Sequence, residues 1–129
     1  MNTKNLVAIF ATLVALVGCN VGNANNPTIS AVIATAGCNS GMSNNKTCVV
    51  TLTYTSHGIT GATLGVTYNP VLTPPAFVTN ISTCPAPNGT NQTCSVSVTY
   101  NRPASGSTRQ NLTFTLGNTN SATIAFTGT

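Results

Sequence analysis

The chain has 129 residues, enough for one domain, and it contains no aspartate or glutamate. Charged residues make up 3% of the sequence, far below the roughly 25% of an ordinary soluble domain. Without side-chain carboxylates the chain cannot build the paired acids of a glycosidase, a Ser-His-Asp triad or a carboxylate cage for calcium. These absences predict a protein that is not an enzyme, has no catalytic residues and uses no cofactor.

Residues 1–18 have the pattern of a secretory signal peptide. Lys4 precedes a largely apolar run, Leu6–Val17, and the small residue Gly18 follows it. This run is too short to cross a bilayer, because a spanning helix needs about 20 apolar residues. The pattern therefore predicts export of the domain that follows.

The end of this segment, Leu16-Val17-Gly18-Cys19, resembles the lipobox of bacterial lipoproteins. The resemblance implies that Cys19 receives fatty acyl groups such as palmitate and becomes the mature N-terminus. Asn20 stands where an aspartate would favour the inner membrane, so the resemblance implies the outer membrane and leaves its periplasmic or surface face open. Residues 19–26 would form a lipid-anchored tether with a reach of about 15 Å. The alternative is an ordinary signal peptide that leaves Cys19 as a free thiol.

Alternating apolar residues predict β-strands across residues 27–129, and no helical period is found there. About seven short strands separated by turn residues are typical of an all-β, immunoglobulin-like sandwich. Asn69-Pro70 and Pro74-Pro75 exclude a central strand and suit a crossing between two sheets. The expected strands cover 28–35, 48–54, 62–68, 76–83, 94–100, 112–116 and 122–126. The side chains expected to face inward are Ile29, Ala31, Ile33, Cys48, Val50, Leu52, Tyr54, Ala62, Leu64, Val66, Tyr68, Phe77, Ile81, Cys94, Val96, Val98, Tyr100, Leu112, Phe114, Leu116, Ala122, Ile124 and Phe126.

One stretch occurs twice, at 38–54 and 84–100, and in each copy a cysteine precedes a Thr-Cys pair and an alternating strand that ends in tyrosine. Acylation of one of the five cysteines would leave an even number, Cys38, Cys48, Cys84 and Cys94. Because both copies keep the same spacing, we favour the local pairs 38–48 and 84–94, while a bond between copies stays open. A metal site is disfavoured, since no C-x2-C spacing occurs and exported cysteines tend to be oxidised.

The remaining polar candidates are few. The basic residues Lys4, Lys46, Arg102 and Arg109 lie far apart in the sequence, and no aromatic residues alternate with them. They predict scattered solubilising charges and no nucleic-acid partner. His57, the only histidine, lies beside Gly58 without an acid to orient it, which predicts a solvated turn; a role in metal binding or in activating a nucleophile is the alternative.

The C-terminal half resembles a bacterial family of immunoglobulin-like modules, the choice-of-anchor and ASPM-SPD2-Hydin-like repeats. The residues that carry this resemblance are Cys84, Gly89, the run 93–100, Pro103, Gly106, the run 112–114 and the run 122–129. The resemblance implies a structural or adhesive module without enzymatic activity, and it names no ligand.

The sequence thus predicts an outer-membrane lipoprotein that serves as a structural or protein-interaction module, as an accessory subunit of an envelope or secretion assembly. Its expected partners are the membrane, through lipid on Cys19, and a protein of the cell envelope. The alternative is a surface adhesin or a carbohydrate-binding module. Sugar platforms use exposed aromatic rings, whereas Tyr54, Tyr68 and Tyr100 are all expected to point inward.

Overall fold

The computed structural model describes residues 26–38, 40–104, 106–117 and 120–129. Within these ranges every regular element is a β-strand, so the predicted all-β fold is confirmed. The expected signal peptide, Cys19 and nearly all of the expected tether lie outside the described residues. The strands are β1 (Thr28–Ile33), β2 (Thr47–Thr55), β3 (Leu64–Asn69), β4 (Phe77–Thr79), β5 (Gln92–Tyr100), β6 (Thr108–Leu116) and β7 (Asn120–Gly128).

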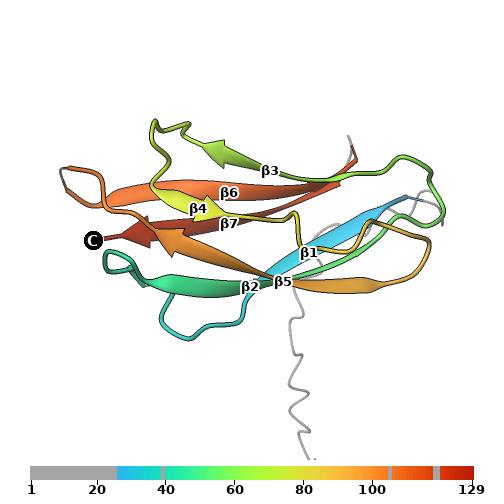
Figure 1. Ribbon diagram of the computed structural model, residues 1–129, viewed down its shortest axis with the longest axis horizontal. Coiled ribbons are helices and arrows are strands. Elements are labelled where there is room, and N and C mark those ends of the chain that lie inside the picture. The colour runs from blue at the N-terminus through green and yellow to red at the C-terminus, as the bar shows by residue number, and fades with distance from the viewer. Residues whose placement is uncertain (1–25, 39, 105, 118–119) are drawn as a thin grey trace, which may run out of the picture.

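The strands form two antiparallel sheets that pack as two layers (Figure 1). The four-stranded sheet has the order β1-β2-β5-β4, and the three-stranded sheet has the order β3-β6-β7. This is the strand order of a constant-type immunoglobulin domain. The predicted immunoglobulin-like sandwich is therefore confirmed.

The core lies between the inner faces of the two sheets. Along β2, β5 and β6 every second side chain is buried, because neighbouring residues of a strand point to opposite faces. Phe77 gathers an aromatic cluster towards one end of the core, with its ring 4.8 Å from that of Tyr100 and 5.5 Å from that of Phe126. Each such aromatic pair adds about 0.5–1.5 kcal/mol beyond the burial of its area. The predicted inward faces are confirmed for these strands.

The chain changes sheet between β3 and β4, where the prolines predict a crossing. The peptide bonds Asn69-Pro70 and Thr73-Pro74 are both cis. Gln110, which is fully buried, holds this crossing at both ends: its side-chain amide donates to the Pro70 carbonyl at 2.7 Å, and its side-chain oxygen accepts from the Phe77 amide at 3.2 Å. A buried amide is tolerated when both of its groups are bonded in this way.

Three strands are shorter than the sequence predicts. The expected 76–83 strand is only β4, because the Asn80 side chain accepts a hydrogen bond from the Ser82 amide at 2.8 Å and turns the chain away. The expected 28–35 strand ends at Ile33. The Thr35 hydroxyl accepts the hydrogen bond from the Val49 amide that a main-chain carbonyl would accept if the strand continued. The expected 62–68 strand begins at Leu64, after a turn that includes Gly61.

The loop between β1 and β2 adds a contact that the sequence does not predict. Met42 is fully buried and forms a parallel bridge with Gly128, donating to Thr127 at 2.7 Å and accepting from Thr129 at 2.9 Å. A side chain at Gly128 would overlap the ring of Tyr100, so only glycine lets β7 pass beneath this ring. The loop thereby covers the outer edge of β7 at its C-terminal end.

Candidate interaction surfaces

The two copies of the repeated stretch pair with each other through β2 and β5, in the middle of the four-stranded sheet. Their antiparallel register sets Val50 opposite Val96, which occupies the equivalent position of the second copy. A local two-fold axis therefore passes through this pair. The consequence is that the equivalent cysteines, Cys48 and Cys94, lie towards opposite ends of the paired strands, opposite Val98 and Leu52 respectively.

Both favoured disulfides are present. Cys38 is bonded to Cys48 and Cys84 to Cys94, with Cα–Cα distances of 6.0 and 5.4 Å and a sequence separation of 10 in each case. On the chain-entropy model each bond contributes about 2–3 kcal/mol to the free energy of unfolding. Each disulfide clips the loop that leads into a central strand, so the two clips secure opposite ends of the sheet.

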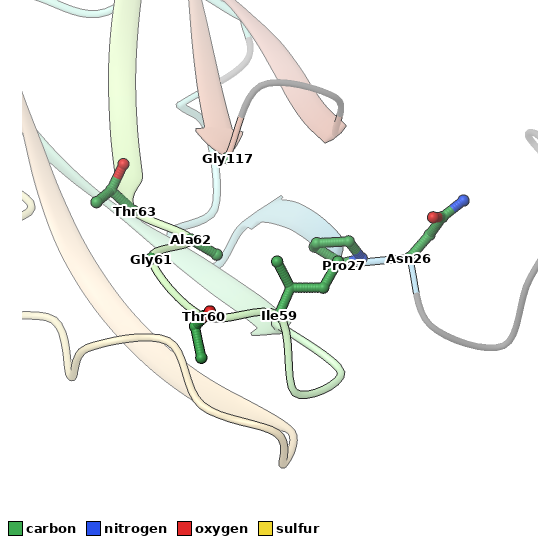
Figure 2. Close-up of a pocket in the computed structure, with 8 residues that line it drawn as sticks. All are labelled: Asn26, Pro27, Ile59, Thr60, Gly61, Ala62, Thr63 and Gly117. Carbon is green, nitrogen blue, oxygen red and sulfur yellow. The ribbon is translucent and has the colours of Figure 1, made fainter.

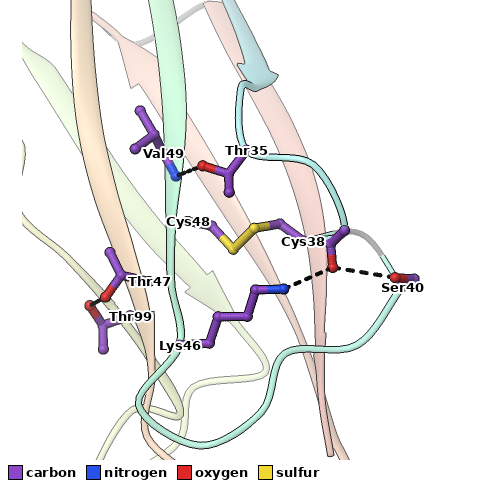
Figure 3. The surroundings of a disulfide bond; sticks show 9 residues. Thr35, Cys38, Ser40, Lys46, Thr47, Cys48, Val49 and Thr99 are labelled. Atoms are coloured by element: carbon purple, nitrogen blue, oxygen red, sulfur yellow. Dashed lines mark hydrogen bonds between the residues drawn. A yellow bond between two sulfur atoms is a disulfide. The ribbon is translucent and has the colours of Figure 1, made fainter.

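In each copy the residue two positions before the second cysteine also holds the loop. Lys46 donates to the Gly37 carbonyl at 3.4 Å, and Ser40 donates to the same oxygen at 3.3 Å (Figure 3). Gln92, the equivalent of Lys46 in the second copy, donates to the Ala86 carbonyl at 3.0 Å. The two loops therefore share one construction: a disulfide and a long polar side chain bonded to a loop carbonyl.

The four edge strands are β1, β3, β4 and β7, and none of them contains a charged residue. Natural proteins usually protect exposed edges with charges, prolines, bulges or covering loops. β4 is only three residues long, and Met42 covers part of β7. This leaves β1 and β3, each of six residues, and the first part of β7 as the longer edges without such protection among the described strands.

A groove of about 610 Å³ runs between β1 and the first half of β7, which are edges of opposite sheets on the same side of the sandwich. It is lined by the apolar residues Ile29, Ala31 and Ala122 and by polar residues that include Thr28 and Thr123. Val32, on the outer face of β1, is 63% exposed. This side of the sandwich thus offers a polar backbone edge beside exposed apolar surface.

A second hollow, of about 400 Å³, lies where the chain enters the domain (Figure 2). It is lined by Asn26, Pro27, residues 59–63 and Gly117, and none of these side chains titrates. His57 lies just before this segment, in an exposed turn with a φ of 50°, and its main-chain amide donates to Thr55. The predicted turn position of His57 is confirmed, and no hydrogen bond orients its ring within the described ranges.

The tyrosines lie as the sequence predicts. Tyr54 and Tyr100 are buried at equivalent positions of the two copies, and Tyr68 packs half-buried against the core. The Tyr54 hydroxyl donates to the Pro85 carbonyl at 2.6 Å, and its burial raises the pKa of this phenol. The Tyr100 hydroxyl is buried without a hydrogen-bond partner in the described part of the chain.

Among the described residues no three metal-ligating side chains gather at one place, and no helix is long and apolar enough to span a membrane. The fold and these surfaces define a class: a disulfide-clipped, immunoglobulin-like β-sandwich with uncharged edges. Comparison with protein families, with curated proteins and with solved structures found no match for this chain.

Proposed function

We propose that this protein is a non-enzymatic outer-membrane lipoprotein whose immunoglobulin-like domain is a structural or protein-interaction module. In this proposal lipid on Cys19 anchors the chain, and the domain serves as an accessory subunit of an envelope or secretion assembly. One observation carries the proposal: the edges of β1 and β3 are open and uncharged. An unpaired strand edge can bind an extended segment of a partner through main-chain hydrogen bonds.

The anchor and the disulfides support this proposal. A tether of residues 19–26 would hold the domain close to the membrane surface, where envelope assemblies are built. Disulfide bonds form and persist in exported proteins, which agrees with a signal peptide over residues 1–18. Both clips lie within the sandwich and stabilise it without occupying the β1 or β3 edge.

The alternative, a surface adhesin or carbohydrate-binding module, has less support. Every phenylalanine and tyrosine of the described residues is buried or half-buried, so none presents a fully exposed ring as a stacking platform for a sugar. Proteolysis of intact cells separates the two proposals. A domain that faces the periplasm survives the protease, whereas a surface adhesin is degraded.

Site-directed photocrosslinking in cells tests the proposed edges. A photoreactive phenylalanine analogue replaces Val32 on β1 or Thr67 on β3, and Ser97 on the central strand β5 is the matched exposed control. We expect crosslinks to an envelope protein from an edge position and none from Ser97. A protein that gives no crosslinks from either edge and purifies as a solitary monomer contradicts the proposal.

The anchor is tested separately. The Cys19→Ala variant should leave the membrane fraction and appear in the soluble periplasmic fraction. Unchanged fractionation would show that Cys19 does not anchor the chain.

A further inference from the structure

The three basic residues of the described domain lie at one end of the sandwich, so the expectation of scattered charges is wrong for them. Lys46 immediately precedes β2, Arg102 follows β5, and Arg109 is the second residue of β6. The register brings these positions together, because the start of β2 pairs with the end of β5, and Arg109 pairs with Thr127 near the end of β7. We call this end of the sandwich the basic pole.

Hydrogen bonds tie the basic pole into one unit. Arg102 donates from its guanidinium to the Thr129 main-chain oxygen, and its main-chain amide donates to the Asn44 side chain at 2.8 Å. The Lys46 carbonyl accepts from the Tyr100 amide at 3.0 Å. Arg109 is exposed, and its guanidinium makes no hydrogen bond within the described ranges.

The opposite end is where the chain enters the domain. Thr28 at the start of β1 pairs with Thr55 at the end of β2, and the turn that holds His57 follows (Figure 1). Within the part of the chain that the structure describes, this end contains no lysine or arginine. The length of β2 separates the two ends by about 27 Å, from a rise of 3.3–3.4 Å per residue. The chain has no carboxylate side chain, so no acidic side chain pairs with these cations.

An apolar groove of about 590 Å³ adjoins Arg102 at the basic pole. One wall comes from the crossing between the sheets, with Leu72 and Pro74, and the other from the turn after β5, with Pro103 and Ala104. Asn101 and Thr108 add polar groups to it. The Arg102 guanidinium already donates from two nitrogens to Thr129, so the guanidinium free to bind at this end is that of Arg109, the neighbour of Thr108. Apolar walls near a free guanidinium suit a ligand in which a carboxylate stands next to an apolar side chain.

We propose that the basic pole binds an acidic segment of a partner polypeptide, with an apolar side chain in the groove and a carboxylate on Arg109. This inference deepens the proposed function and rests on it. A tether that holds the entering end of the chain at the membrane turns the pole away from that membrane, which favours a protein over a lipid surface. The charge at the pole also speeds encounter with an acidic partner, and salt weakens this effect.

Peptide binding to the mature, lipidated protein in a neutral detergent tests the site. The probe is the fluorescein-labelled peptide Gly-Ser-Glu-Leu-Glu-Ser-Gly, and its matched control carries glutamine in place of both glutamates. We expect fluorescence anisotropy to show tighter binding of the acidic peptide and a loss of that preference at high salt. Arg109→Gln should weaken binding about fivefold, as expected for an exposed ion pair.

A charge-relocation variant shows whether the peptide binds at a specific site or responds only to the net charge of the protein. Arg109→Gln combined with Thr60→Lys keeps the total charge and moves one cation to the opposite end, where Thr60 is exposed. We expect this variant to bind as weakly as Arg109→Gln alone. Amide NMR shifts on addition of the peptide should cluster at Asn101, Arg102 and Thr108.

Four results would overturn the inference: no binding of the acidic peptide, equal binding of the glutamine peptide, recovery of binding in the relocated variant, or shifts at the opposite end. Competition by dextran sulfate or by phosphatidylglycerol vesicles at lower concentrations than the peptide would also overturn it, in favour of a polyanion or a lipid surface. The photocrosslinking experiment on the β1 and β3 edges does not depend on peptide binding. If the peptide test fails and those crosslinks are still found, the proposed function holds and only this inference is wrong.

Discussion

The two equivalent tyrosines provide a matched test of how each hydroxyl contributes to stability. Tyr54 is the second-last residue of β2 and Tyr100 is the last residue of β5, and both rings are buried. Replacement by phenylalanine removes one oxygen from each while keeping the ring. Their surroundings differ in one respect. The Tyr54 hydroxyl donates to Pro85 at 2.6 Å, and the Tyr100 hydroxyl has no partner in the described part of the chain.

The two substitutions should change the free energy of unfolding in opposite directions. Tyr54→Phe loses a hydrogen bond and leaves a partly buried carbonyl unpaired, which costs about 1 kcal/mol. Tyr100→Phe removes a buried hydroxyl that has no partner, so it should stabilise the fold by about 1 kcal/mol. For a domain of this size each kcal/mol shifts the melting temperature by roughly 4–8 °C.

Urea denaturation measures both variants, followed by far-UV circular dichroism because the chain lacks tryptophan. Tyr68→Phe is the control, since its ring is half-buried and no hydrogen bond to its hydroxyl is found among the described residues; we expect a change within about 0.5 kcal/mol. The reasoning fails if Tyr100→Phe destabilises the protein as much as Tyr54→Phe does. That result would show that the Tyr100 hydroxyl has a hydrogen-bond partner in solution.

Three further predictions concern glycine, the disulfides and pH. Gly128→Ala should destabilise the fold by about 3 kcal/mol or prevent folding, because the added methyl group would overlap the Tyr100 ring. Gly89→Ala is the control: its added carbon meets only ordinary contacts, so stability should change by less than about 1 kcal/mol. Thermal melts of the two variants make the comparison. Replacement of Cys38 and Cys48 by alanine should lower the free energy of unfolding by about 3 kcal/mol, and a variant as stable as the wild type would contradict a stabilising clip. The raised pKa of Tyr54 keeps its phenol protonated in the folded protein at pH values where the same phenol ionises in the unfolded chain. The contribution of this group to the free energy of unfolding should therefore be fully present below pH 10 and be lost as the pH rises through the folded pKa. Tyr54→Phe should reduce this alkaline loss in a pH series of urea melts, and an unchanged loss would assign it to other groups.

Local pattern was sufficient for much of the fold. Alternation places the core of β2, β5 and β6, and equal spacing in the two copies favours the disulfides that the structure contains. The same alternation marks Gln110 as inward, since it shares the parity of Leu112, although a polar residue gives no apolar signal. Strand ends were predicted less well, because hydroxyl and amide side chains such as Thr35 and Asn80 replace main-chain partners there.

The interaction surfaces depend on pairing that no local window contains. The basic pole exists because Lys46, Arg102 and Arg109, which are distant in sequence, lie beside strand ends that the register brings together. Met42 shows the same limitation: it lies in a polar loop, and only its bridge to Gly128 accounts for its burial. The open edges of β1 and β3 likewise become visible only once the strand order is known.

The placement of the two disulfides has a consequence for oxidative folding. Each native bond joins cysteines 10 residues apart, while every alternative pairing among these four cysteines would close a ring several times as long. Loop-closure entropy therefore favours each native bond by about 1 kcal/mol over its competitors, even in a chain without structure. The pairing of β2 with β5, by contrast, joins distant segments and should be slow. Under oxidising conditions the chain can thus acquire the correct bonds before the sandwich forms, and it should depend little on a disulfide isomerase.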